Sequence, residues 1–216
     1  MSENRSYAAF LFDMDGTLIN SIASANRIWT RWAERHGVDL ATLMAALHGV
    51  RAVETIRRFA PAGTDAEAEA EALTQAEVDD VEGIIAIGGA AAFLATLPGD
   101  RWAIVTSAPR RLAEPRLAAA GVTPPAVMIT ADDVEHGKPA PDCFLMATEC
   151  LGVRAADCLV WEDSPAGIAA AEAAGADVMV VTATHHARLE TPHRSVADFS
   201  ALTVEPEGDR LRLRLG

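Results

Sequence analysis

Lysine is almost absent from this chain of 216 residues, and aromatic residues, cysteine and long apolar runs are also scarce. Of the 18 basic residues, 17 are arginine, and Lys138 is the single lysine. Because a lysine ammonium is a compact point charge that the planar guanidinium replaces poorly, a lone lysine in such a chain is a candidate for a functional position. No apolar run approaches the roughly 18 residues of a membrane-spanning helix, which argues against a membrane protein.

Cysteine usage and net charge exclude further classes. The three cysteines, Cys143, Cys150 and Cys158, form no CxxC pair, so we expect neither a disulfide framework nor a zinc site. A reduced cytoplasm is then the simplest compartment. The net charge of −13 argues against nucleic acid and anionic lipid as partners. The 50% hydrophobic content indicates a globular chain, for which a monomer is the default expectation.

Short apolar runs alternate with helical segments along much of the chain. The runs, read as buried strands, are residues 7–13, 102–106, 126–130, 158–162 and 177–182, and the predicted helices between them are 89–97, 109–120, 142–151 and 165–174. Strands that alternate with helices predict an α/β fold with a doubly wound parallel sheet. In such a sheet, ligands bind beyond the carboxyl ends of the strands.

A long stretch without strand signals, residues 20–88, interrupts this alternation. Its periodicity predicts helices at 22–36, 40–47, 53–59 and 65–81, which is more than one crossover needs. We therefore expect residues 1–19 and 89–216 to form the α/β core and residues 20–88 to form an inserted helical domain. Its last helix carries many acids, which we interpret as a solvated face. At the C-terminus, alternating Arg and Leu over residues 210–215 predict a half-exposed edge strand.

Acidic and hydroxyl side chains stand where three of the predicted strands end. They are Asp13 and Asp15, Thr106 and Ser107, and Glu162 and Asp163. Because the carboxyl ends of parallel strands border a common crevice, we expect these side chains to converge on one site. Neighbouring carboxylates are costly unless a cation or a proton lies between them, and hard oxygen ligands suit Mg²⁺.

Four segments resemble the sequence motifs of the haloacid-dehalogenase-like (HAD) hydrolases, most of which are Mg²⁺-dependent phosphatases. In chain order they are Asp13-Met-Asp-Gly-Thr-Leu18, Ile104-Val-Thr-Ser107, Gly137-Lys-Pro-Ala-Pro-Asp142 and Val160-Trp-Glu-Asp-Ser-Pro-Ala-Gly-Ile168. They occur in the order of the family, each at a predicted strand end or just beyond it. The resemblance implies a Rossmann-like core with an inserted cap and Mg²⁺-dependent hydrolysis of a small phosphate ester.

The resemblance also implies catalytic and substrate-binding roles. Asp13 would be the nucleophile, forming an aspartyl-phosphate, and Asp15 would protonate the leaving alkoxide and then activate water. Lys138 would neutralise both the phosphoryl group and Asp13. The Thr106 hydroxyl and the Ser107 amide would hold phosphoryl oxygens.

The metal ligands follow from the same resemblance. Mg²⁺ would be held by the Asp13 carboxylate, the backbone carbonyl of Asp15 and Asp163. Glu162 would act through a water or from outside the ligand shell. Metal and lysine on the same oxygens would together supply part of the very large rate enhancement that monoester hydrolysis requires.

Within the family, the inserted region resembles the cap of the sugar- and polyol-phosphate phosphatases. The similar stretches are Trp32-Ala-Glu-Arg-His-Gly37 and His48-Gly-Val-Arg-Ala-Val-Glu-Thr-Ile-Arg-Arg-Phe59. This implies that His48 and Arg51 face the crevice and touch the substrate, although a helix-end role for His48 and a surface role for Arg51 are equally compatible with the sequence.

Three alternatives remain at this stage. A β-phosphoglucomutase-like enzyme would carry a cap histidine at the position of Ala25, so the sequence argues against it. A phosphoacceptor module of the receiver type needs about half this length and no cap, and its lysine follows the other motifs, whereas Lys138 precedes Glu162 and Asp163. A binding protein without turnover would not need the complete set of acids together with Lys138.

Overall fold

Six parallel strands form the central sheet, in the order β6-β5-β2-β7-β8-β9. They are β2 (Ala9–Phe12), β5 (Trp102–Val105), β6 (Val127–Ile129), β7 (Cys158–Glu162), β8 (Asp177–Val181) and β9 (Arg194–Val196). The computed structural model describes residues 5–185 and 189–215. Phe12 pairs with Ile104 on one side and Trp161 on the other, so the carboxyl ends of β2, β5 and β7 lie side by side. The predicted doubly wound α/β fold is confirmed.

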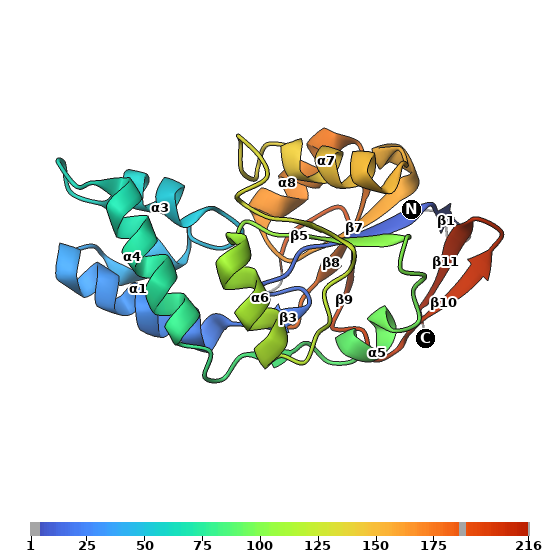
Figure 1. Cartoon of the computed structure of the whole chain (residues 1–216), viewed down its shortest axis with the longest axis horizontal. Coiled ribbons are helices and arrows are strands. Elements are labelled where there is room, and N and C mark those ends of the chain that lie inside the picture. The colour runs from blue at the N-terminus through green and yellow to red at the C-terminus, as the bar shows by residue number, and fades with distance from the viewer. Residues whose placement is uncertain (1–4, 186–188, 216) are drawn as a thin grey trace.

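Each face of this sheet is covered by helices, because alternate residues of each strand point to opposite sides. Ala9 and Leu11 of β2 face α7 (Asp142–Leu151) and α8 (Pro165–Ala174). Phe10 and Phe12 face the side of α5 (Ala90–Leu94) and α6 (Arg110–Ala119). Figure 1 shows the two helix pairs on opposite sides of the strands. Burial on both faces explains why these strands are almost continuously apolar.

The few aromatic residues of the core gather on one face of the sheet. The ring of Trp161 packs against Phe12, Phe93 and Phe199, with centroid separations of 5.7, 5.6 and 5.2 Å. Phe10 joins the cluster at 5.9 Å from Trp161. Aromatic pairs at such distances add to the stabilisation from burial. Trp161, which precedes Glu162 in β7, is thus a core residue.

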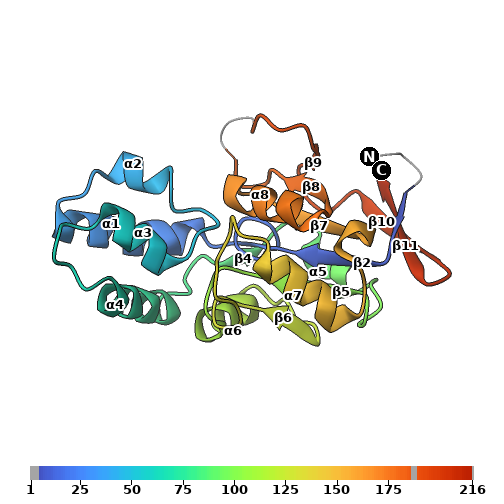
Figure 2. The same cartoon turned by 90° about the horizontal axis from the view of Figure 1, so that it is seen from above.

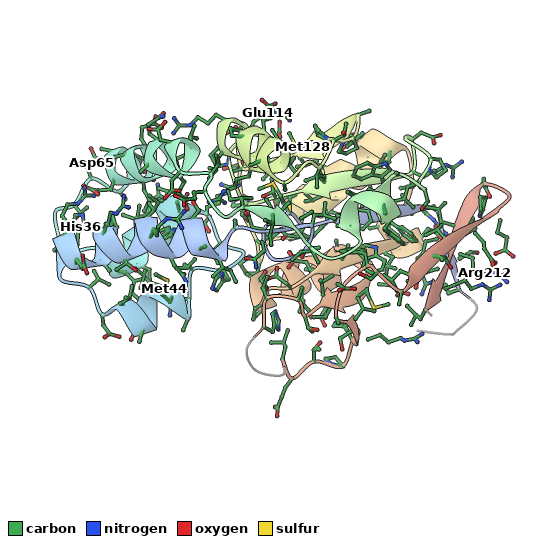
Figure 3. All side chains as sticks on the ribbon, turned by 90° about the horizontal axis from the view of Figure 1, so that it is seen from below. His36, Met44, Asp65, Glu114, Met128 and Arg212 are labelled. Carbon is green, nitrogen blue, oxygen red and sulfur yellow. The ribbon has the colours of Figure 1, made fainter. Side chains whose placement is uncertain are left out.

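Four helices form a separate hydrophobic cluster between β3 (Ile19–Asn20) and β4 (Ile85–Ala86), and we call them the helical cap. They are α1 (Ile22–His36), α2 (Leu40–Met44), α3 (Ala52–Phe59) and α4 (Ala66–Asp79). Figures 1 and 2 show the cap beside the carboxyl edge of the sheet, and Figure 3 labels His36 and Asp65 on its outer part. The interpretation of the acids of α4 as a solvated face is wrong at Glu77, which is buried.

The C-terminal strand lies at the opposite end of the molecule from the cap, where Figure 3 labels Arg212. Here β11 (Arg210–Leu215) is the middle strand of a second sheet, between β1 (Ser6–Tyr7) and β10 (Leu202–Glu207), so the predicted edge position is wrong. Arg212 and Arg214 form ion pairs with Glu207 and Glu205 of β10, which lets a charged strand occupy a central place. The short 3₁₀ turn η1 (Ala155–Asp157) completes the described elements.

Among the residues that the structure describes, no helix has the length and apolarity needed to cross a membrane.

Candidate active site

Three neighbouring strands deliver the candidate residues to one edge of the sheet. Asp13 directly follows β2, Thr106 directly follows β5, and Glu162 ends β7. The amide of Asp13 donates to the Trp161 carbonyl at 2.9 Å, which extends the strand pairing as far as the acidic side chain. The expectation that side chains from separate strands converge is therefore met by the geometry of the parallel sheet.

Lys138 lies beneath this edge and is almost fully buried, with 1% of its surface exposed. Its Nζ donates to Asp13 Oδ1 at 2.6 Å, to Glu162 Oε1 at 2.8 Å and to the Val105 carbonyl at 3.0 Å. All three donors of the ammonium are thereby satisfied, as a buried charge requires. The single lysine of the chain thus neutralises part of the charge of two buried carboxylates.

Burial is the largest influence on the pKa values of Asp13 and Asp163. It raises the pKa of Asp13 to about 7, against the opposing charge of Lys138. Burial, followed by the charge of Glu162, raises the pKa of Asp163 well above its ordinary value. Although burial alone would lower the pKa of Lys138, the charges of Asp13 and Glu162 raise it. One ammonium among three buried carboxylates leaves a negative excess that favours a further cation.

Carboxylate oxygens of Asp13, Glu162 and Asp163 lie within 4.8 Å of one another, so the donor set fits a hard divalent cation. The oxygens of Glu162 are already engaged, however. Oε1 accepts from Lys138, and Oε2 accepts from the amides of Asp163 and Ser164, both at 2.9 Å. Glu162 is therefore suited to holding the loop and the lysine, while Asp13 and Asp163 are better placed to ligate a metal directly.

Gly16 allows the loop after β2 to approach Asp163 closely. Its φ angle is +91°, and a Cβ at this position would lie 2.0 Å from Asp163 Oδ2. Only glycine accepts both the conformation and the contact. The lack of a side chain at Gly16 thus lets the loop that bears Asp13 and Asp15 lie close to Asp163.

A cavity of about 760 Å³ opens above these carboxylates, between the core and the helical cap. Its walls include Trp29, Met44 and Leu47 of the cap and the acids Asp13 and Asp163 of the core. This volume lies in the range of small-molecule sites. The cavity therefore offers a polar floor and a partly apolar wall to a small ligand.

Of the four predicted substrate-binding residues, three line the cavity and one does not. Thr106, Ser107 and His48 line the cavity. The Ser107 hydroxyl donates to the carbonyl of Gly49 at 2.9 Å and so holds the cap loop on the core. Arg51 does not join them. Its guanidinium donates to the carbonyls of Val134 and Glu135, at 2.8 and 2.9 Å, so the expectation that it faces the crevice is not met in this structure.

Glu77, Arg116 and His185 also line the cavity, although no sequence motif marks them as site residues. Arg116 forms ion pairs with Asp15 and Glu77, both at 3.0 Å. His185, after β8, contacts the backbone carbonyl of Asp163 through Nε2 at 2.9 Å. These residues lie within ordinary helix or loop sequence, and only the tertiary arrangement reveals them.

The chain matches the profile of the haloacid dehalogenase-like hydrolases over residues 7–175, and it belongs to this family. It is 38% identical over 211 residues to hexitol phosphatase A of Escherichia coli strain K12, covering 93% of this chain and 96% of that protein. It is also 38% identical over 189 residues to validoxylamine A 7'-phosphate phosphatase of Streptomyces hygroscopicus subsp. limoneus, covering 84% and 88%. Among solved structures, a hydrolase from Pseudomonas syringae superposes with a TM-score of 0.72 at 28% identity, over 82% of this chain and 84% of that one.

Proposed function

We propose that the protein is a Mg²⁺-dependent phosphatase that hydrolyses a sugar or polyol phosphate through an aspartyl-phosphate on Asp13. The observation that carries this proposal is the contact of the buried Lys138 Nζ with Glu162 and with Asp13, the carboxylate at the floor of the cavity. Related proteins named for hexitol phosphate and validoxylamine phosphate hydrolysis support the same chemistry.

The mechanism has two steps, and Asp13, Asp15 and Lys138 have separate roles in them. An Asp13 oxygen attacks phosphorus while the bond to the leaving oxygen breaks, and Asp15 donates a proton to that oxygen. Asp15 then accepts a proton from the water that hydrolyses the acyl phosphate. Lys138 stabilises the charge on Asp13 and on the transferred group throughout.

The residues suited to hold Mg²⁺ are Asp13 and Asp163, with the Asp15 backbone carbonyl, and Glu162 supports them through its contacts with the loop. When bound, the metal would supply positive charge to the phosphoryl oxygens. The Thr106 hydroxyl and the Ser107 amide at the cavity wall would donate hydrogen bonds to the same group. The donor types on this edge of the sheet are therefore matched to a phosphate monoester.

The cavity also favours an uncharged alcohol portion. Of the described residues that line it, Arg116 is the one with a permanently positive side chain, and its guanidinium already pairs with two carboxylates. A second phosphate or a carboxylate on the substrate would be desolvated there without a free cation. Ala25 stands in the wall where a mutase would carry a histidine, which favours hydrolysis over phosphoryl return.

A substrate screen combined with one substitution tests the proposal. We expect sorbitol 6-phosphate or glycerol 1-phosphate to exceed fructose 1,6-bisphosphate and phosphoglycolate in kcat/KM by at least about tenfold, since an unpaired buried charge is costly. The Asp13→Asn variant should release no phosphate from any of these esters. The matched control Asp209→Asn, in the exposed turn between β10 and β11, should retain wild-type rates. Turnover by Asp13→Asn would refute the nucleophile assignment.

A further inference from the structure

Arg116 is a buried guanidinium shared by two carboxylates that come from distant parts of the chain. Its Nη1 donates to Asp15 Oδ1 and its Nη2 donates to Glu77 Oε1, both at 3.0 Å. The side chains of Arg116 and Glu77 are each 6% exposed, and that of Asp15 is 28% exposed. An arrangement of one cation between two acids in such an environment is costly unless every group is oriented.

The three residues belong to three different structural units. Asp15 lies in the loop after β2, Arg116 lies on α6 of the core, and Glu77 lies on α4 of the helical cap. The guanidinium therefore connects the cap to the loop that bears the candidate proton donor. Because a planar guanidinium presents its donors in a fixed fork, Glu77 determines how Arg116 meets Asp15.

The contacts of Asp15 place its two oxygens in different situations. Oδ1 accepts from Arg116 and also from the Ser21 hydroxyl, at 2.5 Å. No hydrogen bond from a described residue reaches Oδ2, and Asp15 lines the cavity. Two donors hold Oδ1, which leaves Oδ2 as the oxygen that is free to exchange a proton with a ligand in the cavity.

Resting on the proposed phosphatase function, we propose that Arg116 is a positioning residue that fixes the Asp15 carboxyl for proton donation, and that Glu77 of the cap holds Arg116 in place. The proton on Oδ2 passes to the leaving oxygen as its bond to phosphorus breaks, and the electron pair of that bond stays on the oxygen. The cap helix α4 thus takes part in orienting the acid, as well as enclosing the ligand.

A purely structural bridge between α4 and α6 is the competing explanation, and the chain contains its own control. Arg111 of α6 and Glu71 of α4 form a second ion pair between the same two helices, at 2.5 Å. This pair is exposed, with 40% and 67% of the two side chains accessible, and neither residue lines the cavity. Breaking it removes a bridge between the helices without touching Asp15.

The experiment compares leaving groups of different basicity. We would measure kcat/KM, which reports the steps up to departure of the alcohol, for glycerol 1-phosphate and for para-nitrophenyl phosphate. Arg116→Met and Glu77→Ala should lower kcat/KM for the alkyl ester by about 10²-fold or more, because its alkoxide needs the proton. The same variants should lower kcat/KM for the aryl ester, whose phenolate leaves without protonation, by less than about tenfold. Arg111→Met and Glu71→Gln should leave both values within about twofold of the wild type, as expected for an exposed pair.

Equal losses for the two esters in Arg116→Met and Glu77→Ala, or no loss in either, would overturn the positioning role. If Arg116→Met does not fold, Glu77→Ala decides the question, because it leaves the guanidinium in place and removes only its cap partner. These outcomes are independent of the proposed function, which fails instead if Asp13→Asn remains active on both esters.

Discussion

The ammonium nitrogen of Lys138 lies 2.6 Å from the Oδ1 atom of Asp13, although the two residues are 125 positions apart in the chain. The strand order explains the encounter. Because β2 lies between β5 and β7, its carboxyl end meets the Val105 carbonyl on one side and Glu162 on the other, and Nζ donates to both as well. One ammonium group therefore connects the carboxyl ends of three strands through its three hydrogen bonds.

Replacement of Lys138 should damage both catalysis and stability. In Lys138→Met, the buried carboxylates of Asp13 and Glu162 lose their common partner, so the free energy of unfolding should fall by about 3 kcal/mol or more. Loss of the charge from the reacting oxygens should lower kcat by at least about 10²-fold. Urea unfolding and steady-state phosphate release measure the two effects separately.

Lys138→Arg provides the matched comparison, since it retains the charge in a side chain that is bulkier and planar. With 1% of Lys138 exposed, the site has no room for a guanidinium fork, and we expect kcat to stay low even where stability is partly recovered. An arginine variant with wild-type kcat would contradict the need for a compact ammonium.

Divalent metal should stabilise the folded protein through Asp163. For a ligand that binds only the folded state, the gain is about 2.7 kcal/mol at a hundredfold excess over Kd, so Mg²⁺ should raise Tm by several degrees. Asp163→Asn should abolish this shift, and a chelator should abolish phosphate release by the wild type. Glu149→Gln, on the exposed side of α7, serves as the control and should keep the full shift. A wild-type Tm that does not change when Mg²⁺ is added would contradict the proposed metal site.

Much of the core could be predicted from the sequence, because strands that are buried on both faces consist of short runs of apolar residues. The strand at 102–106 and the helices at 142–151 and 165–174 match the structure within a residue. The polar residues that follow such runs, Asp13 and Thr106 among them, are brought together by any parallel sheet of this topology. Sequence order and strand polarity are sufficient for that inference.

Contacts between the cap and the core could not be predicted in the same way. Arg116 and Glu77 meet because α4 packs beside α6, and neither residue differs in sequence from the exposed pair of Arg111 and Glu71 one or two turns away. The direction of the Arg51 side chain likewise depends on where the cap loop is placed on the core. These side-chain partners and directions are determined by tertiary packing, which a local sequence pattern does not predict.

Gly16 should tolerate no side chain, because a Cβ there would collide with Asp163 in addition to straining the backbone. Gly63, between α3 and α4, has nearly the same φ, +88°, but a Cβ there would have no neighbour within 4 Å. Gly63→Ala should therefore cost about 1–2 kcal/mol of stability from the left-handed backbone and leave kcat unchanged. Gly16→Ala adds a collision with the Asp163 carboxylate and should reduce kcat by at least about 10²-fold, as for loss of a preorganised group. Equal kcat values for the two alanine variants would show that the close approach to Asp163 has no catalytic importance.

His48 should make the stability of the protein depend on pH below neutrality. Burial, and then the nearby charge of His185, lowers the pKa of His48 in the folded protein. The unfolded chain, with a histidine pKa of about 6.5, then binds more protons than the folded chain in the window just below that value. The free energy of unfolding should therefore fall as the pH decreases from about 6.5 toward the lowered folded pKa, and it should be unaffected by this group above about 7.

His48→Asn isolates this contribution, because asparagine keeps a polar side chain and does not titrate. Its Tm, measured between pH 7.5 and 5, should fall less steeply than that of the wild type below pH 6.5, while the two slopes should coincide above neutrality. The difference arises because protonation of the wild-type ring places a partly desolvated positive charge near His185, which makes the protonated folded state less stable than the neutral one. Identical slopes over the whole range would mean that the His48 ring remains hydrated in the folded protein.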